Sequence, residues 1–414
     1  MLVPRASSIG DHRAVLRLSI GLFLVQAGFH GFTASIPLAL ARAGRNDAEI
    51  GALVGLAALV QILAALAGGA LIDRVGAIRM FLVGGTCYLV ACALLLISGV
   101  GPEATLPLAV ARILQGTGTG VVVPAALSVV PSLVSLERRG ISIATAGASH
   151  NLTLVVIPPL SIFVLDLYGL AGVSVFVAAF VAIGLLIVLA RPFELRATGE
   201  SSLAKASRRF GFAYRSSWLA PLAVMTLWVV HWGVLSAYLP QRAEAAGANI
   251  ALLFVADGVF VLLARIPAGW LADRVRPVIP VVAGVALTAV ALTMLFAPPT
   301  TLTLILAGSL TGLGAALIVQ PLMLALTNRS TDADRGSAFA WFNAMFAVGI
   351  TLGSIGTAPV VERVGFATLL AVAFVALVAS AGVALADRAL RTRPRQRADR
   401  PRDYAAEAGT PIGP

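Results

Sequence analysis

The sequence predicts an all-α integral membrane protein in which twelve transmembrane helices form two six-helix bundles, with both termini in the cytoplasm. Three observations lead to this fold class. Apolar residues make up 59% of the chain and charged residues only 12%, with a mean hydropathy of +0.94. Apolar runs of about 20 residues, the length that spans a bilayer, recur from end to end. The two halves of the chain also repeat each other.

Hydropathy defines the elements and the domains. The expected helices are 16–40, 48–72, 79–99, 105–133, 141–165, 169–190, 218–240, 249–272, 277–297, 301–327, 336–360 and 366–386. They divide into an N-terminal bundle, 16–190, and a C-terminal bundle, 218–386. The remaining parts are a cytoplasmic N-terminal segment (1–15), a basic cytoplasmic linker (191–217) and a basic cytoplasmic tail (387–414) that we expect to be disordered.

The positive charges set the orientation. Most lysines and arginines lie in the termini, in the linker and in loops on the same side of the membrane. The opposite side holds only Arg42, Arg45, Arg242 and Arg363. By the positive-inside rule, both termini then face the cytoplasm of a cell whose inner membrane the chain crosses many times. Because the net charge of +11 is concentrated beside apolar spans, we expect the lipid bilayer as a partner and no nucleic acid.

The repeat aligns residues 51–76 with 251–276 without a gap. It pairs Gly69 with Gly269 and places an Asp-Arg dipeptide at the end of both segments, at 73–74 and 273–274. Each half contains an even number of spans, so the repeat is parallel. Two such bundles can rock against each other to expose a central site to alternate sides.

Two motifs resemble those of the major facilitator superfamily. The first, G-x-L-x-D-R-x-G-x-x-R after the second span, has a weaker copy after the eighth; together they comprise Gly69, Leu71, Asp73, Arg74, Gly76, Arg79, Gly269, Leu271, Asp273 and Arg274. The second, R-x-x-Q-G-x-G-x-G, comprises Arg112, Gln115, Gly116, Gly118 and Gly120. With the six-plus-six layout, the resemblance covers essentially the whole chain and is closest in style to bacterial sugar and drug efflux members.

The first motif has a physical interpretation of its own. Gly69 would let a neighbouring helix approach closely. Asp73 can cap the N-terminus of an adjacent helix and pair with an arginine, a contact expected only when the bundles are closed on the cytoplasmic side. We therefore interpret both copies as a cytoplasmic gate. The alternative is that these charges only anchor the topology.

Two charged residues within spans are candidates for proton coupling, because ionisable groups at membrane depth often mark a transport pathway. Asp257 is the only acid well inside a span. The resemblance assigns the arginine of the fourth span, Arg112, to proton-coupled members, where it tunes a nearby acid. The alternative for this pair is a static salt bridge, or a hydrated acid near the outer mouth. Arg265, in the eighth span, is interpreted as structural.

Histidines and other polar or aromatic residues are candidates for a substrate cavity. His30 and His231 fall at equivalent depths of the first and seventh spans, which line the cavity in this fold, and we expect them to face each other. The full set is Gln26, His30, Gln115, His150, Asn151, Trp228, His231, Trp232 and Asn343. The alternative for each is packing or a satisfied hydrogen bond within the bundle.

These features predict a secondary active transporter, with proton-coupled efflux of a modestly hydrophobic small molecule as the preferred activity. The fifth span departs from the drug-antiporter pattern G-x-x-x-G-P-x-x-G-G, with Ile157, Ser161 and Ile162 where glycines would stand. Proton-coupled uptake or facilitated diffusion of a metabolite, such as a sugar or an organic acid, is therefore the alternative. A non-transporting receptor on the same scaffold is more remote.

Other activities lack their sequence signatures. We find no H-E-x-x-H or G-x-S-x-G motif for an enzyme and no phosphate-binding G-x-x-x-x-G-K-[ST] for an ATP-driven pump. The cysteines, Cys87 and Cys92, lie in one apolar run and suit a helix interior. We thus expect no cofactor, no metal and no enzymatic activity, with a small molecule and protons as partners of a monomer.

Overall fold

The computed structural model describes residues 8–134, 139–193, 214–330, 335–359 and 361–391. Every regular element in these ranges is a helix, and no strand occurs among them. The helices are α1 (Ser8–His30), α2 (Ser35–Arg42), α3 (Asp47–Val75), α4 (Ala77–Ser98), α5 (Thr105–Leu133), α6 (Arg139–Leu189), α8 (Leu219–Ala245), α9 (Ala251–Arg274), α10 (Val278–Met294), α11 (Thr301–Asn328), α12 (Arg335–Ser354), α13 (Val361–Ala386) and α14 (Arg388–Arg391). Short 3-10 turns, Pro102–Ala104 and Ser216–Trp218, precede α5 and α8.

Within these ranges, 9 segments are long and apolar enough to cross a membrane, and the chain is a multi-pass membrane protein. Two shorter apolar helices, Val278–Met294 and Trp341–Ser354, accompany them. One candidate span, Thr145–Leu189, has 45 residues. A straight helix of that length would measure about 70 Å, roughly twice the thickness of the hydrocarbon core.

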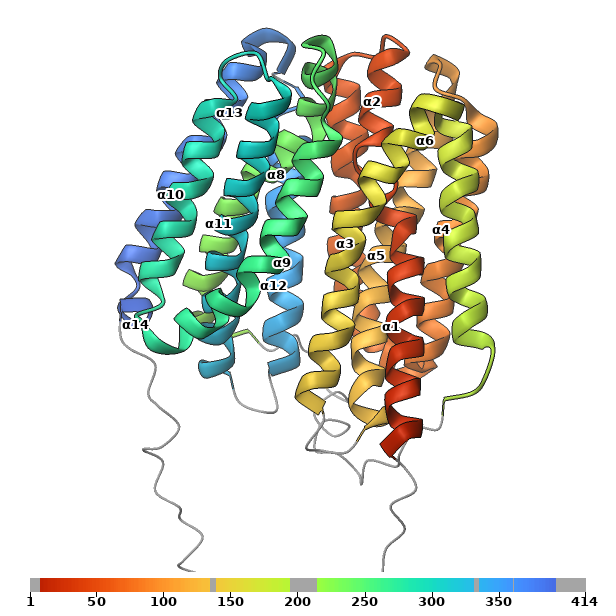
Figure 1. The fold of residues 1–414 in the computed structure, drawn as a ribbon, viewed down its shortest axis with the longest axis vertical. Coiled ribbons are helices and arrows are strands. Elements are labelled where there is room, and N and C mark those ends of the chain that lie inside the picture. The colour runs from red at the N-terminus through yellow and green to blue at the C-terminus, as the bar shows by residue number, and fades with distance from the viewer. Residues whose placement is uncertain (1–7, 135–138, 194–213, 331–334, 360, 392–414) are drawn as a thin grey trace, which may run out of the picture.

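A sharp turn at Gly169 accounts for the length of this segment. Its φ of 65° lies in the left-handed region, which glycine adopts without a steric penalty. Beyond it the chain runs back antiparallel to α1, because Gly21 packs against Val188 whereas Gly31, later in α1, packs against Val177. The expected spans 141–165 and 169–190 are therefore the two arms of α6 (Figure 1).

The helices pack into two groups that stand side by side (Figure 1). The first group contains α1 to α6 and the second contains α8 to α13. In the first, Gly116 of α5 lies against the backbone of Ala57 in α3; in the second, Gly312 of α11 lies against the backbone of Asp257 in α9. A side chain at either glycine would clash with that backbone. Because Ala57 and Asp257 correspond in the sequence repeat, the groups share this packing arrangement.

The two groups touch most closely at one end of the molecule. We call this the distal end, and the end where α1 begins and α14 lies the terminal end (Figure 1). Across the interface, α3 packs on α12 and α6 packs on α9. Near the distal end, Gly55 of α3 lies against Ile355 after α12, and Gly258 of α9 lies against Val155 of α6. Small residues therefore bring the helix backbones together there.

Ion pairs also join the groups at the distal end. Arg42 of α2 contacts Glu244 of α8 at 2.5 Å and Asp166 of α6 at 2.7 Å. Arg242 of α8 contacts Asp47, at the start of α3, at 2.5 Å. These side chains are partly exposed, so each pair contributes about 0.2–1 kcal/mol. Together they favour closure of this end.

The groups separate toward the terminal end (Figure 1). A Cβ added to Gly269, near the end of α9, would meet nothing within 4 Å. The structure is thus in a state that is closed at the distal end and open toward the terminal end.

Removing the distal ion pairs should favour the opposite state. In the double variant Asp47→Asn, Glu244→Gln, each of the two inter-group ion pairs loses its acid. The state closed at the distal end should then be destabilised by about 1.4 kcal/mol, which changes the ratio of the two states about tenfold. Spin labels on cysteines introduced at Ala43 and Ala246, in the adjoining distal loops, should then show a second population with a longer distance.

Glu49→Gln is the matched control, because Glu49 pairs with Arg45 of its own group at 3.0 Å. Its distance distribution should equal that of the parent protein, in which Cys87 and Cys92 are replaced by alanine. An unchanged single distance in the double variant would show that the ion pairs do not hold the distal end closed.

Candidate functional site

The first span is interrupted at mid-depth, where the sequence predicted a continuous helix. α1 ends at His30, and α2 begins at Ser35. Pro37 explains the break, because it has no N–H to donate to the carbonyl of Thr33 and its ring crowds that carbonyl. The hydroxyl of Ser35 donates to the carbonyl of Gly31 at 2.6 Å, which satisfies one of the freed backbone groups. Irregular backbone at membrane depth is tolerated only inside a protein or beside a water-filled cavity.

His30 lies at this break and is the most unusual polar residue of the first group. It is only 6% exposed, and neither ring nitrogen has a hydrogen-bond partner among the residues that the structure describes. The rings next to it are those of Phe29, with centroids 5.3 Å apart, and His150 of α6, with centroids 5.6 Å apart. Buried polar groups are nearly always hydrogen-bonded, so an exception of this kind indicates a place for a ligand or water.

His150 is held in one orientation by a chain of hydrogen bonds. The Tyr88 hydroxyl donates to Gln26 Oε1 at 2.8 Å, and Gln26 Nε2 lies 3.2 Å from His150 Nδ1. Because the Gln26 nitrogen can only donate, His150 Nδ1 accepts and Nε2 carries the proton in neutral imidazole. Gln26 is fully buried and acts as the orienting residue, whereas His150 is only partly buried. The arrangement leaves one imidazole N–H available on the side away from Gln26.

Arg112 is only 3% exposed, and its hydrogen bonds hold α5 against α3. Its Nε donates to the carbonyl of Leu53 and its Nη2 to that of Val54, both at 2.9 Å. Its Nη1 donates to Gln115 Oε1 at 2.7 Å. In this state Arg112 and Gln115 therefore serve helix packing, and Arg112 makes no contact with Asp257.

Asp257 lies in the second group, two turns into α9. It is partly buried, and its Oδ1 accepts a hydrogen bond from the Thr311 hydroxyl of α11 at 2.9 Å. No ion pair is found between this carboxylate and any cation that the structure describes. The expected pair of Asp257 with Arg112 is therefore absent from this state, and its formation in another state remains a prediction.

The aromatic candidates of α8 divide into packing residues and one partly open residue. Trp228 donates to Thr288 Oγ1 of α10 at 3.1 Å, and His231 Nδ1 bonds the Trp228 carbonyl. Both side chains are at most 5% exposed. The His231 ring contacts Trp228 and Trp232 rather than facing His30. Trp232 is partly buried, with its ring 5.9 Å from that of Phe254 in α9.

The other expected site residues lie farther from this centre or only partly within the described structure. Asn151 follows His150 on α6 and is partly buried, and Asn343 of α12 is exposed. At the terminal end, the motif arginines Arg74, Arg79 and Arg274 are exposed, and Gly76 separates α3 from α4 with a φ of 97°. The surroundings of Gly69 and the side chains of Asp73 and Asp273 lie outside the described parts, so the cytoplasmic gate remains a prediction.

The comparisons with known proteins establish the family. The sequence model of the Major Facilitator Superfamily matches residues 18–256 and 218–412, which together span nearly the whole chain. The chain belongs to the Major Facilitator Superfamily. This confirms the family indicated by the two sequence motifs. The superfamily is one of transporters, so the chain is a secondary transporter. No match was found among curated proteins.

Solved structures of POT family transporters have the same superfamily fold. One in complex with 5-aminolevulinic acid has a TM-score of 0.74 and 13% identity, over 92% of this chain and 97% of that chain. Another, in complex with a thioalcohol conjugated peptide, has a TM-score of 0.74 and 12% identity, over 90% and 96%. A mutant peptide transporter POT in complex with alafosfalin has a TM-score of 0.67 and 16% identity, over 90% and 94%. Identities this low show a common fold.

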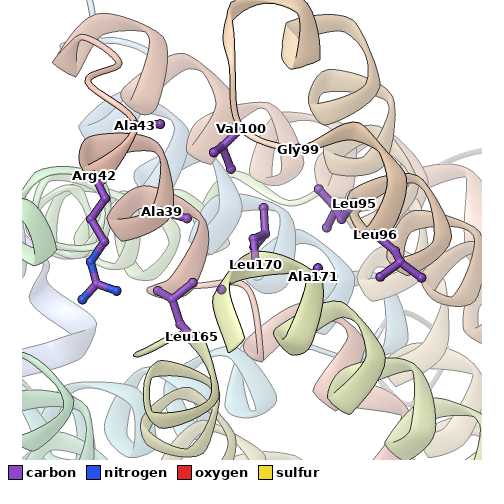
Figure 2. Close-up of a pocket in the computed structure, with 11 residues that line it drawn as sticks. Ala39, Arg42, Ala43, Leu95, Leu96, Gly99, Val100, Leu165, Leu170 and Ala171 are labelled. Carbon is purple, nitrogen blue, oxygen red and sulfur yellow. The ribbon is translucent and has the colours of Figure 1, made fainter. Parts of the chain in front are cut away.

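An apolar pocket of about 340 Å³ is present at the distal end (Figure 2). Ala39 of α2, Leu95 of α4 and Leu165 and Leu170 beside the turn of α6 line it, with Val100 between helices. All its lining residues belong to the first group. Because it does not lie between the two groups, we place the candidate transport site at mid-depth instead, beside His30 and His150.

The sequence interpretation assigned Arg265 of α9 a structural role, and that role stays a prediction. In the structure its guanidinium extends from the second group toward α6 of the first. A Cβ at Gly147 would lie 3.9 Å from Arg265 Nη2, and His150 follows Gly147 by three residues on α6.

The hydrogen bonds of Arg112 predict a stability defect on substitution. Arg112→Lys keeps the charge but cannot donate to two carbonyls and Gln115 together, so it should lower the free energy of unfolding by about 1–3 kcal/mol. The thermal midpoint of the purified protein in detergent measures this effect. Arg363→Lys, at an exposed position, is the control and should leave the midpoint unchanged. A normal midpoint in Arg112→Lys together with lost proton movement would assign Arg112 to coupling instead.

Proposed function

We propose that this protein is a proton-coupled secondary transporter that exports a modestly hydrophobic small molecule across the cytoplasmic membrane by alternating access. One observation carries the proposal. The two helix groups are joined at the distal end and separate toward the terminal end, and Arg265 extends from the second group toward α6 of the first. A body built in this way can expose the same site to either side by rocking one group against the other.

The proposed topology has twelve spans. α1 and α2 count as one interrupted span, the arms of α6 count as two, and the shorter α10 and α12 each cross once. The excess of lysine and arginine at the terminal end supports a cytoplasmic location for both termini, in the inner membrane. On that orientation the structure is open to the cytoplasm, which is the state that takes up an exported compound. Each monomer contains a complete site.

In the proposed cycle, closure at the terminal end follows substrate binding. The empty space beside Gly269 allows a helix to approach when the groups close there. The paired motifs around Asp73 and Asp273 would then form the cytoplasmic gate. The distal pairs of Arg42 with Glu244 and of Arg242 with Asp47 would open at the same time. The cell exterior gains access to the site as the cytoplasm loses it.

Asp257 is the proposed proton carrier. It is the only acid well inside a span, it is partly buried, and its one hydrogen-bond donor is the neutral Thr311. A carboxylate between the groups can take up a proton while it faces outward and release it while it faces the cytoplasm. Inward proton movement then drives outward movement of the compound. Arg112, tied to α3 in this state, would assist only after a rearrangement of its hydrogen bonds.

Proton-coupled uptake or facilitated diffusion of a metabolite is the second candidate. Two observations favour it: the substitutions at Ile157, Ser161 and Ile162 in the fifth span, and a fold shared with POT transporters solved with 5-aminolevulinic acid or peptide-like ligands. Export is preferred because most of the buried polar side chains that the structure describes, such as Gln26, Arg112 and Trp228, are already hydrogen-bonded within their own group. A hydrophilic sugar or peptide would need a denser set of hydrogen-bonding groups.

Replacement of the proposed proton carrier should uncouple transport. The assay uses everted vesicles whose interior has been acidified. With the wild-type protein, addition of a transported compound should release protons from the vesicle interior, and a fluorescent dye that reports the pH difference across the membrane should detect this release. In Asp257→Asn this signal should fall to that of vesicles without the protein. Thr311→Val, which removes the hydrogen bond but keeps the carboxylate, should retain coupling with an altered pH dependence.

Glu362→Gln is the control, because Glu362 is an exposed acid in the first turn of α13. Full proton movement in Asp257→Asn would exclude this residue as the proton carrier. Solute movement that follows ATP rather than an ion gradient would exclude secondary transport altogether. Proton uptake in the opposite direction with the same compound would favour the second candidate.

A further inference from the structure

Arg265 is an intramembrane cation with no partner of opposite charge. It lies 14 residues after Ala251 and nine before Arg274, so it is about 21 Å and about 14 Å from the two ends of α9. Its side chain is partly buried and makes no hydrogen bond or ion pair with any residue that the structure describes. A guanidinium at this depth is costly to hold and normally pairs with an acid or with backbone carbonyls, as Arg112 does.

The position of Arg265 is set by packing between the groups. α9 runs antiparallel to the first arm of α6: Gly258 contacts Val155 nearer the distal end, and Arg265 lies over Gly147 farther along. At Gly147, α6 has no side chain, which leaves room for a guanidinium to extend across the interface. Arg265 therefore points into the space between the groups and not into lipid.

Two imidazoles of the first group lie beside that space. His150 is one turn beyond Gly147 on α6, the residue over which Arg265 lies. Its Nδ1 is occupied by Gln26, so its Nε2 is the atom that can donate to a ligand. Next to it, His30 is more than nine-tenths buried with both nitrogens unpartnered. The guanidinium of Arg265 therefore lies one helical turn from His150, and the ring of His30 lies 5.6 Å from that of His150.

We propose that Arg265, His150 and His30 form an anion-binding site and that the transported compound is an organic acid carrying a carboxylate or a similarly compact anionic group. This inference rests on the proposed transport function and specifies its substrate class. Arginine suits a carboxylate because its planar donors bind both oxygens, and the imidazoles can complete the hydrogen bonding. Phe29, edge-on to His30, provides an apolar surface for the rest of the molecule.

An anion at this position would connect the two groups. Arg265 belongs to the second group and both histidines belong to the first, so the bound compound contacts each side of the rocking interface. Asp257 lies eight residues before Arg265 on α9, about 12 Å away along the helix axis, and forms no ion pair with it. The carboxylate of Asp257 therefore remains available for the proton while the anion occupies its own site.

Probes that differ only in charge test this inference. The full chain, purified in lipid nanodiscs, would be titrated with benzoate, benzamide and benzylamine, and with 4-phenylbutyrate and its amide, and binding would be followed by calorimetry. We expect the acids to bind at least about tenfold more tightly than their amides, which corresponds to about 1.4 kcal/mol. Arg265→Gln should lose that preference, and Arg265→Lys should retain part of it.

Arg276→Gln is the matched control, since Arg276 is an exposed arginine just beyond α9. It should bind the acids as the wild type does. His30→Asn should weaken binding of the acids more than binding of the amides, and the variant protein should keep the wild-type fold. All variants should elute as the wild type does on size-exclusion chromatography, which separates a binding defect from a folding defect.

Three results would overturn the anion site. The first is equal binding of acids and amides by the wild type, and the second is unchanged binding of acids by Arg265→Gln. The third is no binding of either acid at millimolar concentration. Failure of the proposed function would give a different result from failure of the anion site. If acids bind as expected but no compound of any charge moves across the membrane, the anion site is supported and the transport function is contradicted. If amides or amines are transported across the membrane and acids are not, the transport function is supported and the anion site is contradicted.

Discussion

The interior of a bilayer provides no water to satisfy a backbone N–H or carbonyl, and this constraint governs the whole structure. It explains why every described element is a helix and why the chain turns sharply only near the ends, as at Gly169. The one interruption at mid-depth, between α1 and α2, is therefore informative. It occurs inside the first group, beside His30, where the Ser35 hydroxyl donates to the free carbonyl of Gly31.

The same constraint separates the polar side chains into two kinds. Gln26, Tyr88, Arg112 and Trp228 are buried and hydrogen-bonded within their own group, so they fix helix positions. Among the described residues, His30 and Arg265 have no such partner although they lie at membrane depth. Arg265 extends across the boundary between the groups, and His30 lies next to His150 of α6, the helix that packs on α9. That distribution favours a ligand site between two bodies over a structural network inside one.

The apolar runs, the repeat and the paired Asp-Arg turns were sufficient to predict a helical membrane protein of this superfamily. Other features depend on distances that sequence does not contain. The break after His30 had a signal in Pro37, but a proline can also be absorbed as a kink, as Pro240 is in α8. The bonds of Arg112 to two carbonyls depend on its rotamer and on how closely α3 approaches. The distal ion pairs join residues about 200 positions apart and belong to one conformational state.

The central claim is that the site between the groups opens to one side of the membrane at a time. A cysteine in place of Asn151, with Cys87 and Cys92 replaced, tests it through reaction with a membrane-impermeant maleimide applied to either face of oriented vesicles. Without substrate, the account predicts labelling from the face that carries the termini and little from the other face. Equal labelling from both faces under the same conditions would indicate a continuous pore and contradict the account, as would labelling from the distal face alone.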